Sequence, residues 1–350
     1  MSSVAEVVDA VVGGDTHSQV HQLEMATPAG VVISRVSVGN DAAGFAAALA
    51  WIGAHAPGPR LIVGLEGTRS YGVGLARALS GAGLVVAEVE QPSRKARRGK
   101  GKSDPIDAHH AVASTLAMDS GRLPVPRADG DREALRILMG AHREITDAKT
   151  RHVNQLRALL LTGDDADRAL ARGRLGLGRL DAIARRRGRA GQTREQAVRR
   201  EHARRLAMAV KQACHELKAL RRQLLEVIEC LAPAMTAQPG IGPISAAALL
   251  LGFSHPGRCR NDAAFAALSG TSPVPASSGK TVRHRLNHGG DRQLNRALHD
   301  IAKWRMLHCP RTRAYVERRT AEGKTPKEIR RCLKRYIARQ QFRFMTTAMG

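Results

Sequence analysis

Three stretches near the N-terminus have the residue pattern of β-strands. Residues 6–37 contain VVDAVVGGD, QVHQLEMA and VVISRVSV. The first is a nearly continuous apolar run, and the other two alternate apolar and polar positions, as strands with one buried face do. Turn residues at 15–18 and 27–30 separate the three stretches. We therefore expect three consecutive strands over these residues.

A pattern of helix, strand, helix and strand follows. Asn40 and Asp41 predict the start of a helix that ends near Gly53, LIVGLE (61–66) predicts a short buried strand, and a helix is expected from about Tyr71 to Leu79. LVVAEVE (84–90) predicts a further strand. Strands that alternate with helices in this way favour a mixed α/β sheet covered by helices. We assign residues 1–123 to this N-terminal domain.

The middle of the chain has a helical pattern. A helix is expected from about Asp104 to Met118, followed by a linker at 124–130. From 131 to 232 apolar residues recur three and four positions apart, which predicts a helical, coiled-coil region. Within it, residues 168–205 contain thirteen Arg and three acids. Such a run is either a solvated face or an arm that contacts nucleic acid.

Residues 238–345 predict a mainly α-helical C-terminal domain. An apolar helix is expected at 245–252, then a loop rich in Gly, Ser and Pro at 269–279. A helix around 291–308 and a basic helical tail at 311–343 complete the domain.

The overall charge points to a polyanionic partner. The chain has 56 Lys and Arg against 31 Asp and Glu, a formal net charge of +25. Nucleic acid is the expected partner, because neutralised phosphates release condensed counterions; a ribosome-associated or membrane-surface protein is the alternative. Aromatic residues make up 3% of the chain, which argues against recognition by base stacking.

Several features predict a bacterial cytoplasmic protein associated with the nucleoid. No run of about 18 apolar residues suggests a membrane span, so no membrane partner is expected. The N-terminus lacks the basic segment of a signal peptide. The five cysteines include no CxxC pair, so neither a zinc site nor a disulfide framework is indicated.

Four acidic residues are the candidate metal ligands. Asp15 and Glu66 lie at the ends of predicted strands, and Asp104 and Asp107 lie three residues apart at the start of a helix, on one helical face. Carboxylates at one sheet edge suit Mg²⁺, and two such ions can clamp the attacking and leaving oxygens of a phosphodiester. Taken singly, Asp15 is also a plausible turn residue, Glu66 a surface acid and Asp104 a helix cap.

Three further segments favour contact with nucleic acid. A basic run at 93–102 contains six cations and no acid, namely Arg94, Lys95, Arg97, Arg98, Lys100 and Lys102. In PGIGP (239–243), Gly240 and Gly242 can adopt positive φ, so that amides at the next helix N-terminus face phosphate, as in helix-hairpin-helix elements; an ordinary turn is the alternative. The third segment, SGTSPVPASSGKTVRHR (269–285), contains Ser277, Ser278 and Lys280, followed by Arg283 and Arg285.

Together these motifs resemble the DEDD-type insertion-sequence transposases with a catalytic serine, the IS110/IS1111 group now described as bridge-RNA-guided recombinases. LEGTRSYG, the basic run before GKSDPIDA, QPGIGP and the SSGK loop occur in that family's order and approximate spacing, over nearly the whole chain. The sequence departs from the family at Gly14, where an aliphatic residue usually precedes the first Asp, and at Ser18 and Gln19, near which the family often has Lys.

The resemblance implies a fold and a reaction. It implies an RNase H-like (RuvC-like) N-terminal domain, as in Holliday-junction resolvases, with Asp15, Glu66, Asp104 and Asp107 as the Mg²⁺-binding acids. Ser278, with Ser277 as runner-up, would form a phosphoserine link to DNA.

The resemblance also implies partners. A structured non-coding guide RNA would pair with double-stranded donor and target DNA, and the protein would act as a homo-oligomer, dimer or tetramer. Two rival functions stay open: a metal-dependent junction nuclease that uses water, and a non-catalytic nucleic-acid-binding protein.

Overall fold

The computed structural model describes residues 2–90, 104–188, 190–275, 284–285 and 287–349, with backbone alone at 104–106, 275 and 284. A five-stranded sheet forms the N-terminal part, in the order β3-β2-β1-β4-β5. Its strands are β1 (Ala10–Thr16), β2 (Val20–Ala26), β3 (Val32–Gly39), β4 (Leu61–Leu65) and β5 (Val85–Glu88). The strands β1, β2 and β3 pair antiparallel, whereas β4 and β5 run parallel to β1. The sequence-based expectation of a mixed sheet is confirmed.

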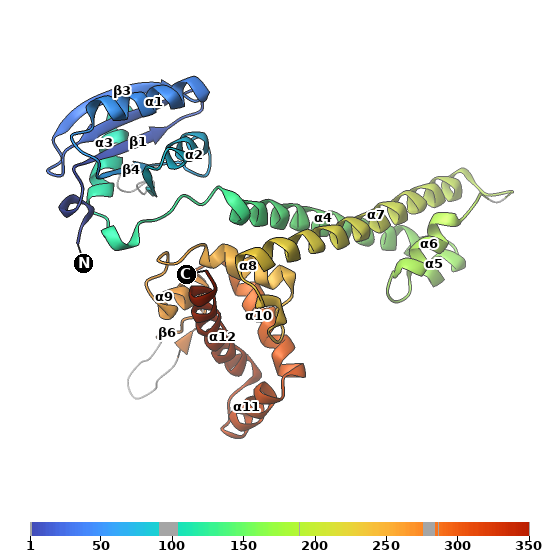
Figure 1. Cartoon of the computed structure of the whole chain (residues 1–350). Helices are drawn as coiled ribbons and strands as arrows, with labels where there is room; N and C mark the ends of the chain where they lie inside the picture. Colours follow the sequence, from blue (N-terminus) through green and yellow to red (C-terminus); the bar gives the residue numbers. More distant parts are fainter. Residues whose placement is uncertain (1, 91–103, 189, 276–283, 286, 350) are drawn as a thin grey trace.

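Helices cover both faces of this sheet (Figure 1). On one face, α1 (Ala42–His55) and α2 (Val73–Gly81) pack on alternate strand residues such as Val12, Leu23 and Val63. On the other face, α3 (Asp104–Leu116) packs on Val11 and Ile62 through Val112. The two-residue alternation of strands therefore divides the sheet into two separately buried faces.

The first strand begins later than its apolar pattern predicts. Residues Val4–Glu6 form a short 3-10 helix, η1, and β1 begins only at Ala10. The carboxylate of Asp9 accepts a hydrogen bond from the Arg60 backbone N–H, 2.9 Å away, and pairs with its guanidinium. The chain is thereby held at the start of β4 before it enters the sheet, so the apolar residues Val7 and Val8 lie outside the strand.

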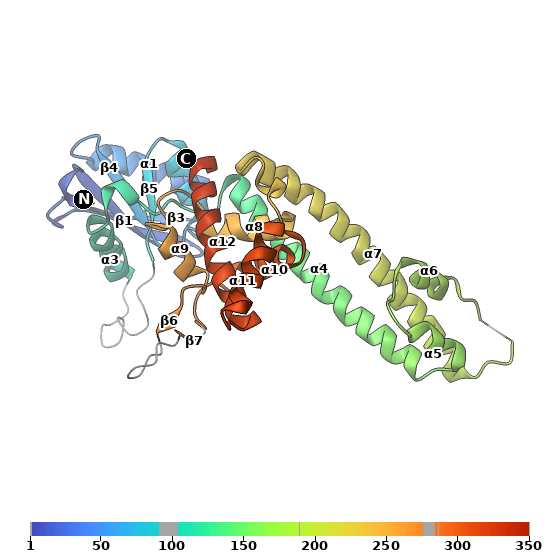
Figure 2. The ribbon, with the colours of Figure 1, turned by 90° about the horizontal axis from the view of Figure 1, so that it is seen from below.

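A long helical hairpin extends from the sheet and the C-terminal helices (Figures 1 and 2). Its arms are α4 (Gly130–Leu161) and α7 (Arg194–Leu231). At its tip, α5 (Asp165–Ala171) and α6 (Leu177–Arg185) pack against both arms around a separate apolar core that includes Leu156, Leu180 and Leu206.

The C-terminal part is mostly helical, as the sequence predicts. A single core joins the base of the hairpin to this part, with Leu135, Phe253 and Phe265 at its centre. Its elements are η3 (Met235–Ala237), α8 (Pro243–Phe253), α9 (Asp262–Leu268), β6 (Val274–Pro275), β7 (His284–Arg285), α10 (Arg292–His308), α11 (Pro310–Ala321) and α12 (Pro326–Met349). A further 3-10 helix, η2 (Ser120–Arg122), follows α3.

A polar cluster lies where the sheet meets the helical part. Glu88 on β5 pairs with Arg127 in the connection to α4, and with Arg69 at 3.2 Å. Burial lowers the pKa of His255 to about 4, and the positive charge of Arg258 acts in the same direction. Burial also lowers the pKa of Arg132 to about 10. Cations outnumber acids in this cluster, so it holds unfavourable like-charge contacts at low dielectric.

Candidate functional site

Asp15 and Glu66 lie side by side at the ends of two parallel strands. The pairing of β1 and β4 places Gly14 beside Leu65, and the Glu66 backbone N–H continues the ladder by donating to the Gly14 carbonyl oxygen at 3.0 Å. Parallel neighbours bring their carboxyl ends to one sheet edge, so the two acids converge there. Both are buried, Asp15 at 5% and Glu66 at 2% exposure.

The side chains of both acids lie on the face that α3 covers. A Cβ added at Gly13 would meet the Ala108 carbonyl oxygen on α3, and one added at Gly64 would meet the Thr115 hydroxyl. Asp15 follows Gly13 by two residues, and Glu66 follows Gly64 by two, so each points to the same face. Glycine at 13 and 64 therefore lets α3 approach the strands closely beside the acids.

The first turn of α3 reaches the same edge of the sheet. Ala108 and Val112 contact β1 at Gly13, while Met118, after the helix, accepts a hydrogen bond from Val4 near the opposite edge. The helix thus runs antiparallel to β1, and its first residues lie toward Asp15. Asp104 begins α3, and Asp107 is half-buried three residues later. The start of α3 therefore lies toward Asp15 and Glu66, and the convergence of the four acidic side chains stays a prediction.

The side chains that the structure describes do not form a complete metal site. In the part of the chain with described side chains, no group of three or more His, Cys, Asp or Glu residues is close enough to bind a metal ion. The side chains of Asp15, Glu66 and Asp107 are therefore not close enough together to coordinate one metal ion. The side chain of Asp104 lies outside the described part of the structure. Two buried carboxylates on neighbouring strands are nevertheless a hard-oxygen donor pair of the kind that Mg²⁺ prefers.

Two residues that sequence reasoning missed lie on the same face of the sheet as these acids. His17 Nε2 lies 2.9 Å from an Asp15 carboxylate oxygen, and strand alternation already places residues 15 and 17 on one face. Glu24 on β2 is fully buried on the α3 face. It contacts His109 Nδ1 of α3 at 2.6 Å and accepts from Arg35 Nε at 2.8 Å. The sequence did contain a signal for Glu24, because it is an acidic residue within the apolar part of the QVHQLEMA strand.

The glycine turn before α8 differs from its expected form. Gly240 has φ +77°, as expected, but Gly242 has φ −93° and simply precedes the helix. A Cβ on Gly240 would meet the Trp304 ring at 3.0 Å, so this glycine allows α10 to pack against the turn. Gly242 is exposed, and its N–H donates to the Ser245 hydroxyl at 3.1 Å. The prediction of positive φ is wrong for Gly242, because an extended residue can lead directly into Pro243.

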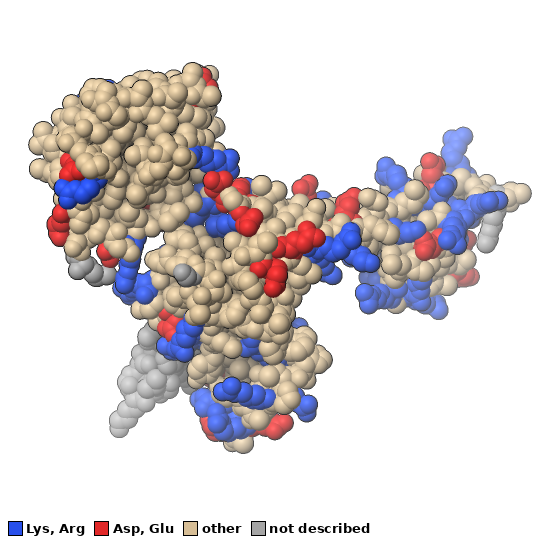
Figure 3. Space-filling view, viewed as in Figure 1, with Lys and Arg blue, Asp and Glu red and all other residues tan. Residues whose placement is uncertain are grey.

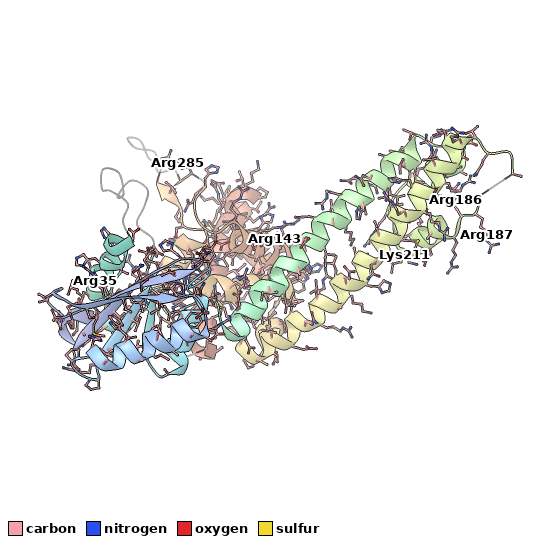
Figure 4. All side chains as sticks on the ribbon, turned by 90° about the horizontal axis from the view of Figure 1, so that it is seen from above. Arg35, Arg143, Arg186, Arg187, Lys211 and Arg285 are labelled. Atoms are coloured by element: carbon pink, nitrogen blue, oxygen red, sulfur yellow. The ribbon has the colours of Figure 1, made fainter. Side chains whose placement is uncertain are left out.

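Most of the remaining predicted site residues lie outside the described residues. These are Arg94, Lys95, Arg97, Arg98, Lys100 and Lys102 of the basic run, and Ser277, Ser278, Lys280 and Arg283 of the serine loop, the segment 276–283 between β6 and β7. Arg285 is described: it is exposed on β7, which pairs with β6 (Figure 4). The strands β6 and β7 therefore bring the two ends of the serine loop together.

The base of the serine loop is held tightly. A Cβ on Gly270, where φ is +64°, would meet the Gly289 carbonyl oxygen at 2.4 Å, and one on Gly290 would meet the Gly270 amide nitrogen at 2.6 Å. Asn295 on α10 donates from Nδ2 to the Ser269 carbonyl oxygen at 2.7 Å. Only glycine fits such close backbone crossings, so the loop leaves the helices from a fixed origin.

Basic side chains gather at the hairpin tip (Figure 3). Two ion pairs tie this tip together, Arg186 to Asp167 and Lys211 to Asp181. Other arginines are exposed there, including Arg172, Arg174, Arg179, Arg185, Arg187 and Arg194. The described residues of 168–205 thus include the end of α5, all of α6 and the start of α7, and they present an exposed cationic surface at the tip. No helix in the described part of the chain is long and apolar enough to cross a membrane.

Comparisons with known proteins identify two matched segments. Residues 12–163 match the family model for DEDD-type IS110 transposases, described as "Transposase". Residues 232–317 match the model described as "Transposase IS116/IS110/IS902 family". The first segment includes Asp15, Glu66, Asp104 and Asp107, and the second includes the serine loop.

A curated relative agrees with these matches. The "Insertion element IS110 uncharacterized 43.6 kDa protein" of Streptomyces coelicolor is 35% identical over 117 residues. The alignment covers 32% of this chain and spans 29% of that protein's length. The two family models agree with each other and together cover about two thirds of the sequence. The chain belongs to the IS110 family of insertion-sequence transposases.

Proposed function

We propose that this protein cuts and rejoins the DNA of an insertion sequence through a phosphoserine intermediate. Asp15, Glu66, Asp104 and Asp107 would hold Mg²⁺, and Ser278 would be the nucleophile. The observation that supports this most directly is the burial of Asp15 and Glu66 at adjacent strand ends, on the face where α3 begins. A purely structural sheet edge has no need for two buried acids there, since burying carboxylates costs free energy.

The acidic residues would hold Mg²⁺ beside the scissile phosphate. When bound, Mg²⁺ polarises a phosphodiester and neutralises the charge that develops on its oxygens. Asp15 and Glu66 would supply ligands from the rigid sheet, while Asp104 and Asp107 would supply them from α3. His17, at 2.9 Å from Asp15, would orient that carboxylate. Glu24 would hold α3 in place through His109.

The serine loop would perform the covalent step. The Ser278 hydroxyl oxygen attacks phosphorus, a bond from phosphorus to a deoxyribose oxygen breaks, and the proton passes from the serine to the strand that leaves. A free strand hydroxyl then attacks the phosphoserine and releases the serine, so no external energy source is needed. Arg283 and Arg285 would neutralise charge on the phosphorane.

The acids and the serine would come from different protomers of a homo-oligomer, a dimer or tetramer. A structured guide RNA would select donor and target DNA by base pairing, which leaves few base contacts to the protein. The net charge of +25 and the exposed arginines of the hairpin tip suit a partner with many phosphates. The basic run at 94–102 would bind the backbone of the same nucleic acids.

A covalent-trapping assay tests this function. Full-length protein would be incubated with Mg²⁺, element-end DNA and RNA transcribed from the flanking sequence, then denatured and examined for a protein–DNA adduct. The adduct should form in the wild type and be absent in Ser278→Ala and Asp104→Ala. Ser277→Ala and Asp9→Asn are matched controls, since Asp9 pairs with Arg60 at the other end of β1. Both controls should form the adduct.

The rival functions give different products. A water-using nuclease predicts Mg²⁺-dependent nicks that persist in Ser278→Ala, with no adduct in any variant. A non-catalytic binding protein predicts neither nicks nor adduct, and DNA binding that survives loss of all four acids. An adduct that shifts to dependence on Ser277 would reassign the nucleophile within the loop.

A further inference from the structure

A cavity of about 650 Å³ lies beside the base of the serine loop. One wall is the segment Gly270–Pro273, which leads into the loop, and the opposite wall is formed by α12 and the end of α11. Arg285, just after the loop, also lines the cavity, and Figure 4 labels this residue. Its volume falls within the usual range for ligand pockets in proteins, which is roughly 300–1,000 Å³.

The cavity is strongly cationic. Its lining includes one acid, Glu328, and six basic residues: Arg285, Arg319, Lys324, Arg331, Lys334 and Arg335. Glu328 is already engaged at the start of α12, where it accepts hydrogen bonds from the Thr325 N–H and hydroxyl at 2.9 and 2.8 Å. Of the six cations, Arg319 has an ion pair within the described part of the chain, with Glu322. The positive charge in the cavity is therefore largely uncompensated.

Lys334 distinguishes this cavity from an ordinary basic surface, because its charged group is buried. Its side chain lines the cavity although the residue is 9% exposed. The ammonium donates to Asn295 Oδ1 at 2.5 Å, and no ion pair joins it to an acid among the described residues. An ammonium has three donors, so two stay available. A buried cation is costly without a counter-charge, and an anion in the cavity would supply one.

The same lysine is linked to the serine loop. Asn295, which accepts from Lys334, donates from Nδ2 to the carbonyl oxygens of Ser269 and Gly270 at 2.7 and 3.3 Å. An anion bound at Lys334 would thus contact the network that fixes the origin of the loop. Apolar wall residues, Pro273, Ile329 and Cys332, are suited to contact with a sugar or base.

The geometry points to a binding site for the phosphodiester backbone of a DNA strand in this cavity, next to the phosphate that the serine loop would attack. The cavity is larger than a single phosphate requires, and its cations are spread from β7 to α12, as neighbouring phosphates on one strand would need. The assignment of the strand as the one that is cut rests on the proposed function; the assignment of the cavity as a DNA-backbone site does not.

Binding of a labelled single-stranded DNA to the full chain tests the cavity directly. Fluorescence anisotropy would compare wild type with Arg331→Ala/Arg335→Ala and with a matched control, Arg313→Ala/Lys327→Ala, which removes two exposed cations of α11 and α12 outside the cavity. The cavity variant should weaken binding about tenfold or more, and its salt slope should fall by about 1.4, the value for two single-strand phosphate contacts. The control should change affinity less than about threefold, as expected for surface charges outside the site.

A second measurement locates the DNA without any substitution. Cys332 lines the cavity, whereas Cys230 is exposed on α7. Saturating DNA should slow the reaction of Cys332 with a thiol reagent several-fold, as followed by mass spectrometry of each cysteine, and leave Cys230 unchanged.

Three results would overturn the assignment. They are a cavity variant that loses no more affinity than the control variant, unchanged reactivity of Cys332, and a loss confined to RNA of the same sequence. Neither measurement requires the protein to cut DNA, so both can be made in a Ser278→Ala background. A missing covalent adduct would therefore reject the proposed function without affecting this site, and normal binding by the cavity variant would reject the site alone.

Discussion

The Thr16 hydroxyl donates a hydrogen bond to the Glu66 carbonyl oxygen, 2.9 Å away, across the ends of two parallel strands. This bond fixes the backbone of one candidate metal ligand to the strand that holds the other, Asp15. It is buried and joins positions fifty residues apart in sequence. The relative position of the two acids therefore depends on a side-chain contact as well as on the sheet ladder.

Thr16→Val should loosen this connection. It keeps the shape of the side chain but removes the hydroxyl, leaving a buried carbonyl oxygen without its partner, so the free energy of unfolding should fall by about 1–3 kcal/mol. Urea denaturation would measure it, with Thr320→Val as the exposed control on α11, expected within about 0.5 kcal/mol of wild type. Equal stability of Thr16→Val and wild type would show that the bond does not hold the edge together.

Gly13→Ala should separate α3 from the sheet. The new Cβ would lie 2.4 Å from the Val112 backbone nitrogen and 2.6 Å from the Ala108 carbonyl oxygen, so the helix must move. We expect a loss of about 1–3 kcal/mol in unfolding free energy, typical of overpacking, and weaker Mg²⁺ binding by calorimetry because Asp104 and Asp107 move with α3.

Two other glycines are controls for that substitution. A Cβ at Gly14 would approach most closely the Cδ2 atoms of Leu65 and Leu23, the far ends of flexible side chains, so Gly14→Ala should cost less than Gly13→Ala. Gly53 in α1 has open space around it, and Gly53→Ala should stabilise the protein by about 0.5–1 kcal/mol. A Gly13→Ala protein as stable as Gly14→Ala would contradict the close approach of α3 to β1.

Glu24→Ala should release α3 in a different way. Glu24 is fully buried, but its partners Arg35 and His109 have side chains that are 56% and 51% exposed. Both can regain water, so the expected loss is about 1–3 kcal/mol, below the 3–5 kcal/mol of a fully buried pair. A double-mutant cycle with His109→Ala should give a coupling energy above about 0.5 kcal/mol. Additive effects would mean that the contact does not position the helix.

The stability of the protein should fall as the pH is lowered from 7 to 5, in part because of His255. Burial lowers its folded pKa to about 4 from an ordinary 6.5. Between these values the unfolded chain binds a proton that the folded chain does not, so acid favours unfolding. Burial raises the pKa of Glu88, but pairing with Arg127 and Arg69 outweighs it and lowers the pKa from 4.5, so Glu88 contributes only below this window.

Thermal melts at pH 7 and pH 5 would measure this effect. His255→Gln should show a smaller drop in Tm than wild type, while His202→Gln, an exposed position on α7, should show the wild-type drop. His21, His142 and His299 also have lowered pKa values, so part of the drop should persist. An unchanged drop in His255→Gln would contradict the burial of that imidazole.

The sequence predicts strands and helices well where apolar residues recur with a single clear spacing, every second position for strands or every three to four for helices. The alternation of QVHQLEMA and VVISRVSV and the cap at Asp41 led to β2, β3 and α1, and Asp41 does accept a hydrogen bond from Gly44. The start of β1 was wrong because Val7 and Val8 have strand-like side chains, but the Asp9–Arg60 pairing decides where the strand begins. That pairing joins distant residues and leaves no local signal.

The candidate site was predictable only in part for the same reason. Asp15 and Glu66 follow apolar strands, so their convergence could be inferred from the order of elements. Glu24 and Lys334 could not, since their roles depend on which helix packs over them: His109 of α3 for one, and Asn295 of α10 for the other. The role of a buried polar residue depends on its neighbours in the folded structure, and the pattern of residues along the sequence does not reveal those neighbours.

The hairpin of α4 and α7 sets a length scale for any partner. With 32 residues, α4 extends about 48 Å at 1.5 Å per residue, the distance covered by roughly 14 base pairs of duplex. Its two arms are joined by apolar packing at both ends, around Leu135 at the base and Leu156 at the tip. A nucleic acid shorter than this span cannot contact both ends of the hairpin at once.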